Sequence, residues 1–583
     1  MMRQPALQRH CNSGANHQHL MLVAILVTTS LFVLLPGRTT AQGGDSGDTD
    51  KQIYELERER IEGLPLSDKP SAPLPPPEAD ELQKSFKYTP MDVDFSPELS
   101  APVINAVPVP KPRWDRLYPV HIKAGFGNYL TPAIDATVSN AFGGRDPRLS
   151  WQANYHHLST WRGHVEDANF AENHAGVKGR YYLDKHTAYG HLNYRHDKLN
   201  FFGDTSSINL EDRPDSTRQR FSRIEALVGF KNNFDTTGFQ YDVGLRVRQF
   251  SDRHENSEFH FSLLPKAKYH INDMFAAGVD LRLTTSSINE QLVLGDAVSR
   301  LFVDGAPFVT VQWQDLRVKA GVRFAYVSQD SVSETRVFPI LDAQYALMDG
   351  KLAPFLKLGG QTHYTQRFGV VDRNPWLDPQ LSVVAPTYEN FNLEAGVRGH
   401  IANVNYRVAG FFRSFDNYLI FEAPHIDGPE LPEIATPRQG YFLTNYRDDF
   451  TMAGLDLEVE AMIRDKGNVG AMLNYTGGSV ADSGVYHIPQ FMSAIWGGYQ
   501  FGDKVNVRSQ LNLIGPRDLG VDTTGAIVED ELFIDLNLSA EYHISSRISV
   551  WLQLNNLLNQ EYFRWYGYQE RQIDFRLGGS VKF

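Results

Sequence analysis

The chain lacks the sequence features that usually mark an enzyme. Its 583 residues contain one cysteine, Cys11. They contain no Gly-x-Ser-x-Gly motif, no phosphate-binding loop and no cysteine-based motif. No motif therefore indicates nucleophilic catalysis or nucleotide binding. We therefore expect a protein that is not an enzyme and has no cofactor and no metal centre.

Long hydrophobic runs are equally scarce. Only residues 20–35 approach the roughly 20 consecutive apolar residues that a transmembrane helix requires. The mean hydropathy is -0.36, yet 12% of the residues are aromatic. A helical membrane protein would be more apolar, whereas a membrane β-barrel turns half of each strand towards water and can be hydrophilic on average.

The first 41 residues predict a secretory signal peptide. Arg3 and Arg9 precede the apolar run, and the small residues Thr39, Thr40 and Ala41 follow it. A retained signal anchor is the alternative. Because Cys11 lies before the apolar run, the mature chain would have no thiol and no disulfide.

The charge balance is acidic, and cleavage would make it more so. The whole chain has 56 basic and 69 acidic residues, a formal charge of -13. The leader contains Arg3, Arg9 and Arg38 and no acidic residue, which leaves 53 basic against 69 acidic residues, or -16. Nucleic acid is therefore an unsuitable partner.

Residues 42–115 form a Pro-rich, acidic segment. One short helix is expected near residues 51–62, ended by Gly63, and prolines recur from Pro65 to Pro112. Such a composition predicts an extended or disordered periplasmic segment. It could be a tether, a strap that enters the barrel, or a passive linker, because composition alone does not separate these alternatives.

The last twelve residues alternate strictly between apolar and polar side chains. One row holds Ile573, Phe575, Leu577, Gly579, Val581 and Phe583, and the other holds Gln572, Asp574, Arg576, Gly578, Ser580 and Lys582. This period of two is typical of a strand with one apolar and one wet face. Ending on Phe583 is common in outer-membrane barrels.

The same alternation recurs through residues 116–583, where we count 22 strands, with 20 or 24 as alternatives. Very short turns alternate with long loops such as 201–220, 366–387, 418–449 and 516–530. Short turns on one side and long loops on the other predict an all-β, transmembrane antiparallel β-barrel with the long loops outside the cell. A soluble β-sandwich would also alternate, but it does not explain the leader and the one-sided loops.

The C-terminal third resembles TonB-dependent outer-membrane receptors. The motifs that resemble the family are residues 374–379 (NPWLDP), 388–396 (YENFNLEAG), 411–420 (FFRSFDNYLI), 454–460 (GLDLEVE), 488–489 (IP) and 556–562 (NLLNQEY). Arg571 stands where the family has a closing Gly-Arg pair, with Glu570 in place of glycine. The resemblance implies a 22-strand barrel that binds or transports a ligand across the outer membrane of a Gram-negative cell.

One part of the family pattern is missing. Family members have a globular plug of more than a hundred residues before the barrel, and residues 42–115 are too short and too Pro-rich to match it. No TonB-contacting box is recognisable. A 22-strand barrel needs something in its lumen, which could be the Pro-rich segment, inward-folded loops or a partner protein. The alternative function is a non-transporting structural or assembly subunit, with periplasmic or outer-membrane proteins as partners besides lipid.

Two polar clusters are candidate ion sites, although solvated loops are the simpler interpretation of both. Histidines and a carboxylate that could bind zinc are His156, His157, His164, Glu166 and His174. Acidic residues that could bind calcium are Asp518, Asp522, Glu529, Asp530 and Glu531. Neither set has the fixed spacing of a metal motif.

Aromatic residues crowd the last long loop. They are Tyr562, Phe563, Trp565, Tyr566 and Tyr568. Trp376, in an earlier long loop, is a further aromatic residue of the same kind. Such rings could stack on a sugar, a chelate or a partner surface, so we take these six as candidate ligand-binding residues. The alternative, which we prefer, is an interfacial aromatic belt that faces the membrane.

Overall fold

The computed structural model describes residues 118–140, 148–203, 217–232, 238–289, 298–329, 332–378, 385–422, 442–477, 486–521 and 527–583. All of them belong to one compact unit, Gly63–Phe583. The expected signal peptide and the Pro-rich segment lie outside the described residues. No helix within these ranges is long and apolar enough to cross a membrane.

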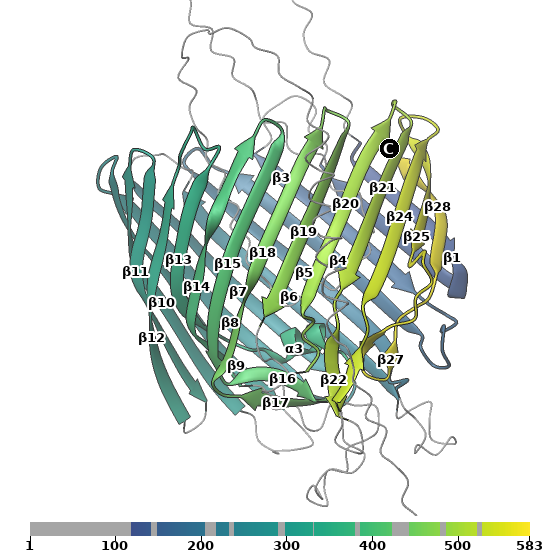
Figure 1. Ribbon diagram of the computed structural model, residues 1–583, viewed down its shortest axis with the longest axis horizontal. Coiled ribbons are helices and arrows are strands. Elements are labelled where there is room, and N and C mark those ends of the chain that lie inside the picture. Colours follow the sequence, from purple (N-terminus) through teal and green to yellow (C-terminus); the bar gives the residue numbers. More distant parts are fainter. Residues whose placement is uncertain are drawn as a thin grey trace, which may run out of the picture. The chain divides into compact units, whose positions relative to one another are not determined.

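A single antiparallel sheet of 22 strands closes on itself (Figure 1). Its first half consists of β1 (Val120–Gly127), β2 (Thr131–Ser139), β3 (Leu149–Ser159), β4 (Phe170–Tyr182), β5 (His186–Asn200), β6 (Arg218–Asn232), β7 (Phe239–Asp252), β8 (Ser257–His270), β9 (Phe275–Asn289), β10 (Val298–Trp313) and β11 (Leu316–Gln329). Its second half consists of β12 (Val332–Tyr345), β13 (Ala353–His363), β14 (Thr387–Ile401), β15 (Val404–Asp416), β18 (Phe450–Ile463), β19 (Gly467–Gly477), β20 (Phe491–Phe501), β21 (Val505–Ile514), β24 (Phe533–His543), β25 (Ile548–Asn555) and β28 (Asp574–Lys582). The expected strand count is confirmed.

The ring is closed by the first and last strands. His121 pairs with Lys582, and the register continues to Gly127 opposite Arg576. The main-chain N–H groups of Val120 and Phe583 each donate to the other residue's carbonyl at 3.0 Å. Closure removes both sheet edges, which a barrel in lipid requires because unpaired backbone groups cannot reach water there.

The alternation of the last strand is present in three dimensions. Phe575 and Leu577 are 47% and 59% exposed on the outer surface, whereas Asp574 and Arg576 are almost fully buried on the inner wall. The same contrast holds along β25, where Val550 faces out. The barrel therefore has an apolar exterior and a polar interior wall.

Connections differ in length between the two ends of the barrel. At one end they are as short as residues 314–315, 402–403 and 502–504, and at the other they include 364–386, 417–449, 515–532 and 556–573. The long connections contain α3 (Arg367–Arg373) and the hairpins β16 (Tyr418–Glu422)–β17 (Leu443–Arg447), β22 (Arg517–Val521)–β23 (Ile527–Asp530) and β26 (Phe563–Trp565)–β27 (Tyr568–Gln569). The barrel strands begin and end at the short-turn end, as the even count predicts.

Large rings of the inner wall lie directly on glycines. A Cβ atom on Gly470 would approach the Trp496 ring to 2.4 Å, and one on Gly125 would approach the Trp551 ring to 2.4 Å. Glycine at these positions leaves room for an indole to lie flat against the wall.

The two faces of β19 provide a test of membrane orientation. Leu473 lies in the outward register and Met472 in the inward register, opposite Glu458. We expect Leu473→Arg to destabilise the barrel in lipid vesicles by about 2–4 kcal/mol, because arginine near the bilayer centre is costly on the lipid face. Met472→Arg should cost much less. Guanidinium unfolding of both variants measures the difference, and equal losses would contradict the assigned orientation.

Candidate functional site

The connection between β13 and β14 forms α3 inside the barrel (Figure 1). Its seven residues (RFGVVDR) start after the extended Gln366 and end at Asn374, whose main-chain N–H donates to the Val370 carbonyl. Pro375 follows and disfavours helical backbone at Asn374. Val370 and Val371 are buried, so the short helix depends on its packing.

The carboxylate of α3 binds the wall of β5 and β6. Asp372 Oδ1 lies 3.1 Å from Arg195 Nη1 and also pairs with Arg223 Nη1. Asp197 Oδ2 lies 2.6 Å from Arg195 Nε and 4.0 Å from Arg223 Nη2. We call these two carboxylates and two guanidinium groups the helix latch.

The start of the same connection is bound further along the wall. Gln366 Oε1 accepts a hydrogen bond of 2.9 Å from Arg248 on β7. The main-chain N–H of Arg367 donates to the fully buried Glu258 on β8 at 2.8 Å. These contacts hold the connection against β7 and β8, which are not the strands that it joins.

The described part of the connection follows the inner wall away from its own strands. Tyr364 contacts β10 and β9, Gln366 reaches β7, and Asp372 reaches β6 and β5. Going round the ring from β13, β5 is the eighth strand, so α3 lies inside the barrel far from the strands that it connects. The expectation that inward-folded loops could occupy the lumen therefore holds for this described segment.

Other long connections pack against α3 and enclose an apolar core. Its buried members are Phe201, Phe221, Phe250, Val370, Val371, Leu377, Leu419, Phe421, Phe442 and Tyr568. They come from the ends of β6 and β7 and from the connections after β5, β13, β15 and β25. We call the described parts of these connections, with residues 486–490, the loop cap.

Main-chain hydrogen bonds join two parts of the loop cap. Leu377 and Phe442 form an isolated parallel bridge. The Phe442 N–H donates to the Trp376 carbonyl at 2.8 Å, and the Asp378 N–H donates to the Phe442 carbonyl at 2.9 Å. The connections after β13 and β15 are therefore held together by backbone as well as by apolar packing.

Three of the six aromatic residues singled out in the sequence meet inside the loop cap. Trp376 stacks on Tyr568 with ring centroids 4.2 Å apart. Trp565 packs against Phe421 at 5.1 Å and Phe442 at 5.3 Å. The interfacial-belt interpretation is wrong for these residues, because the rings pack against other loops instead of lining the membrane-facing wall.

The other three lie apart from this stack. Tyr562 stacks on Phe533 at the start of β24, with ring centroids 3.5 Å apart. Burial raises the pKa of Tyr562 well above its usual range. Phe563 and Tyr566 remain 41% and 47% exposed. Ligand binding by the six residues stays a prediction, and Phe563 and Tyr566 are the two most open to solvent.

The histidine set does not assemble into one site. His156 and His174 are cross-strand neighbours with ring centroids 5.6 Å apart, and His156 Nδ1 lies 2.5 Å from Asp135. His157 Nδ1 lies 2.8 Å from Asn173 Oδ1, and His164 contacts the carbonyl of a distant loop. Among the described residues, no three His, Cys, Asp or Glu side chains could hold a metal ion.

The acidic set is divided in a similar way. Asp530 pairs with Arg517 across the β22–β23 hairpin at 3.0 Å. Burial and the neighbouring Glu529 raise the pKa of Asp518. Asp522 lies outside the described residues.

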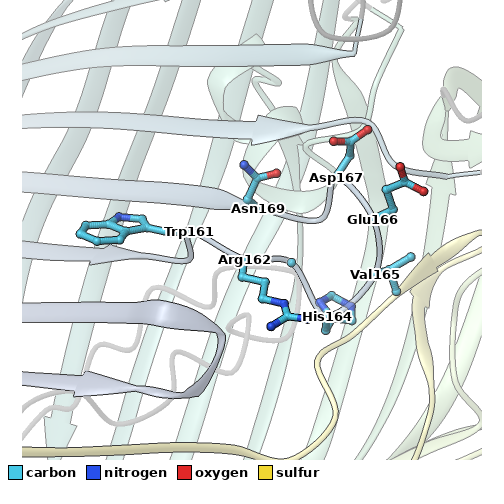
Figure 2. A pocket seen from close by; sticks show the side chains of 8 residues that line it. Trp161, Arg162, His164, Val165, Glu166, Asp167 and Asn169 are labelled. Atoms are coloured by element: carbon cyan, nitrogen blue, oxygen red, sulfur yellow. The ribbon is translucent and has the colours of Figure 1, made fainter. Parts of the chain in front are cut away.

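The connection after β3 encloses a small polar pocket (Figure 2). Its lining combines the exposed ring of Trp161 with Arg162, Glu166 and Asp167. His164 Nε2 lies 2.7 Å from the Gln569 carbonyl in the C-terminal connection. This contact links the pocket to the connection between β25 and β28, which contains five of the six candidate aromatic residues.

Sequence reasoning missed the helix latch. Asp372, Arg195 and Arg223 are far apart in the chain, and no pattern connects them. The sequence contains one signal that this connection packs against other residues. Residues 370–377 (VVDRNPWL) are unusually apolar for a solvated loop. Such a segment must pack against something.

Acid should loosen the loop cap through His487. Both ring nitrogens of His487 are buried without hydrogen-bond partners, and its ring contacts Trp565 at 4.6 Å. Burial, with Arg517 nearby, lowers the pKa of His487 to about 3. Because the unfolded loop then binds more protons, cap stability is complete above pH 6.5 and decreases as the pH falls towards 3.

The expected loss at pH 4.5 is about 1–2 kcal/mol, below the full linkage value because part of the side chain is exposed. Hydrogen exchange of residues 563–569 at pH 7 and pH 4.5, corrected for intrinsic rates, measures it. His487→Leu should remove the pH-dependent part. If the variant keeps the whole acid response, other groups are responsible.

Comparison with solved structures finds the same barrel. The FrpB iron transporter of Neisseria meningitidis has a TM-score of 0.62 and 11% identity, over 80% of this chain and 82% of that chain. A mutant of the ferric enterobactin receptor PfeA of Pseudomonas aeruginosa, in complex with enterobactin, has a TM-score of 0.59 and 11% identity, over 80% and 81%. FpvA of P. aeruginosa, bound to a heterologous pyoverdine and iron, has a TM-score of 0.59 and 13% identity, over 80% and 72%.

No protein-family model and no curated protein sequence matches the chain. At 9–13% identity, the structural likeness concerns the fold. The similar proteins are receptors and transporters, which agrees with the expectation of a non-enzymatic protein. The chain is a closed 22-strand antiparallel β-barrel with the fold of the TonB-dependent receptors.

Proposed function

We propose that this protein takes up a ligand across the outer membrane and that the loop cap gates its lumen. The observation that supports this proposal is the path of the β13–β14 connection. Its described part lies inside the barrel and is bound to β5 and β6 by the ion pairs of Asp372. A segment held there narrows the lumen while it is bound and widens it when it is released.

Ion pairs suit a releasable contact. Asp372 and Arg195 are 36% and 35% exposed, so water reaches them. Pairs this exposed stabilise a contact by about 0–1 kcal/mol. A ligand can therefore replace Asp372 at Arg195 without a large free-energy cost, whereas Arg223 is 12% exposed and keeps Asp197 as a second carboxylate nearby.

The outer surface of the cap is the proposed place of ligand capture. Trp161 is 66% exposed, and Phe563 and Tyr566 expose large parts of their rings on the C-terminal connection. Exposed rings beside charged side chains stack on planar ligands. We propose a sugar or a chelate as the ligand, as FpvA and the PfeA mutant named above bind pyoverdine–iron and enterobactin.

A structural or assembly subunit is the second candidate. The observation that favours it is the apolar core of the cap, where Tyr568 and Phe442 are 1% and 2% exposed. Releasing such a core exposes apolar surface at about 25 cal/mol per Å². A cap that never opens would make the barrel a scaffold, with residues 42–115 as the segment that contacts periplasmic proteins.

Single-channel conductance in a planar bilayer separates the two functions. We expect the mature chain to be mostly closed and Asp372→Asn to raise the open probability about twofold to fivefold, the effect of losing about 0.4–1 kcal/mol. Replacing residues 364–386 with a short Gly-Ser linker should give a large, steady conductance. Asp349→Asn, in a short turn at the other end, is the matched control.

The same recordings on chains without residues 42–115 test the Pro-rich segment. If only that deletion opens the pore, the segment fills the lumen and the cap is not the gate. If every variant stays closed, transport is contradicted and the scaffold function is favoured.

A further inference from the structure

Cations are nearly absent from the outward face of the barrel wall. In the described strands, side chains in the outward register are apolar or uncharged, as along β24, β25 and β28. Lysine or arginine occupies this register at three positions, Lys198, Arg218 and Arg220. All three lie on the adjacent strands β5 and β6, at the long-loop end.

The neighbours of these residues fix their orientation. Asp197 is buried on the inner wall, and Leu199 packs against the apolar core of the loop cap. Lys198 lies between them and is exposed. In β6, Phe221 belongs to the same core, which turns Arg220 outward.

The strand register brings like charges together. Lys198 and Arg220 are direct cross-strand partners, and Arg218 is the next outward residue of β6. Side chains that are opposite each other in antiparallel strands have Cβ atoms about 4.5–5.5 Å apart, and like charges there are destabilising. Neither Lys198 nor Arg220 forms an ion pair with any residue in the described ranges.

Their height on the wall coincides with the membrane surface. Below Lys198, the first outward residue of β5 is His196, whose Nδ1 lies 3.0 Å from Ser222 Oγ on β6. The next two are Tyr194 and Leu192, which are 42% and 52% exposed. Four residues of strand separate Tyr194 from Lys198, about 13 Å along a strand and about 9 Å in height at a tilt near 45°. Tyrosines prefer the interface, so the cations reach the headgroup layer above it.

We propose that Lys198, Arg218 and Arg220 bind the phosphate group of an anionic lipid in the outer leaflet. The acyl chains would lie along the apolar surface below, which includes Leu192, Ile224 and Val228. Arginine binds phosphate through two parallel hydrogen bonds, and lysine adds a point charge. The phosphate supplies the counter-charge that the described residues do not provide. The inference requires the barrel to be in the outer membrane and is independent of what the loop cap does.

Binding of purified lipid tests this site. The mature barrel in a neutral detergent is titrated with diphosphorylated lipid A, and bound lipid is measured by native mass spectrometry. We expect one tightly bound lipid per barrel and about a ten- to hundredfold loss of affinity in Lys198→Gln/Arg220→Gln, because two charge-assisted contacts are removed. The matched control, Lys185→Gln/Lys504→Gln, removes two exposed charges at the short-turn end and should bind like the wild type.

Two further arms identify what the site recognises. Lipid A without its phosphates should bind the wild type as weakly as the double variant binds the intact lipid. Millimolar inorganic phosphate should not displace the lipid. The proposal is overturned if the double variant or the phosphate-free lipid binds with full affinity, or if free phosphate competes effectively.

Folding of each variant is checked by the shift in electrophoretic mobility on heating, which is typical of a closed barrel. The single variants Lys198→Gln and Arg220→Gln keep the test decisive if the double variant does not fold. Each should lose part of the affinity, and wild-type affinity in both would also overturn the proposal.

Discussion

Within a membrane, a polypeptide must satisfy every backbone hydrogen bond internally, and for strands this requires a closed ring. The pairing of β1 with β28 closes this ring, and the contact between Val120 and Phe583 completes it at the short-turn end. The other features follow from closure. It fixes an even number of strands, leads both chain ends to one side and creates a wide lumen that side chains of the wall alone do not fill.

The long connections fill part of that lumen. α3 lies on the inner wall at β5 and β6, and three other long connections, those after β5, β15 and β25, pack on it to form an apolar core. Its contacts with the wall are of both kinds, since Phe221 of β6 and Phe250 of β7 belong to the apolar core and the latch joins Asp372 to Arg195 and Arg223 by charge. Separating the cap from the wall would therefore break these ion pairs and also expose the rings of Phe221 and Phe250.

The periodic parts of this structure were predictable from the sequence, whereas the cap was not. A period of two, read from Ile573 to Phe583, specifies which face meets lipid, and short turns such as residues 314–315 mark the ends of strands. The path of residues 364–386 depends on contacts with strands more than a hundred residues away, such as Arg367 with Glu258. No local pattern encodes such a contact, and for this reason Trp376 and Tyr568 were mistaken for a membrane belt.

The latch and the outward cations occupy the same two strands. Along β5, Arg195 and Asp197 face the lumen while Lys198 faces the membrane; along β6, Arg223 faces inward and Arg220 outward. Since alternate residues share one backbone, any displacement of these strand ends moves both sets of side chains. A lipid phosphate between Lys198 and Arg220 would relieve their repulsion and hold β5 and β6 in register. It would thereby also hold Arg195 and Arg223 where Asp372 meets them.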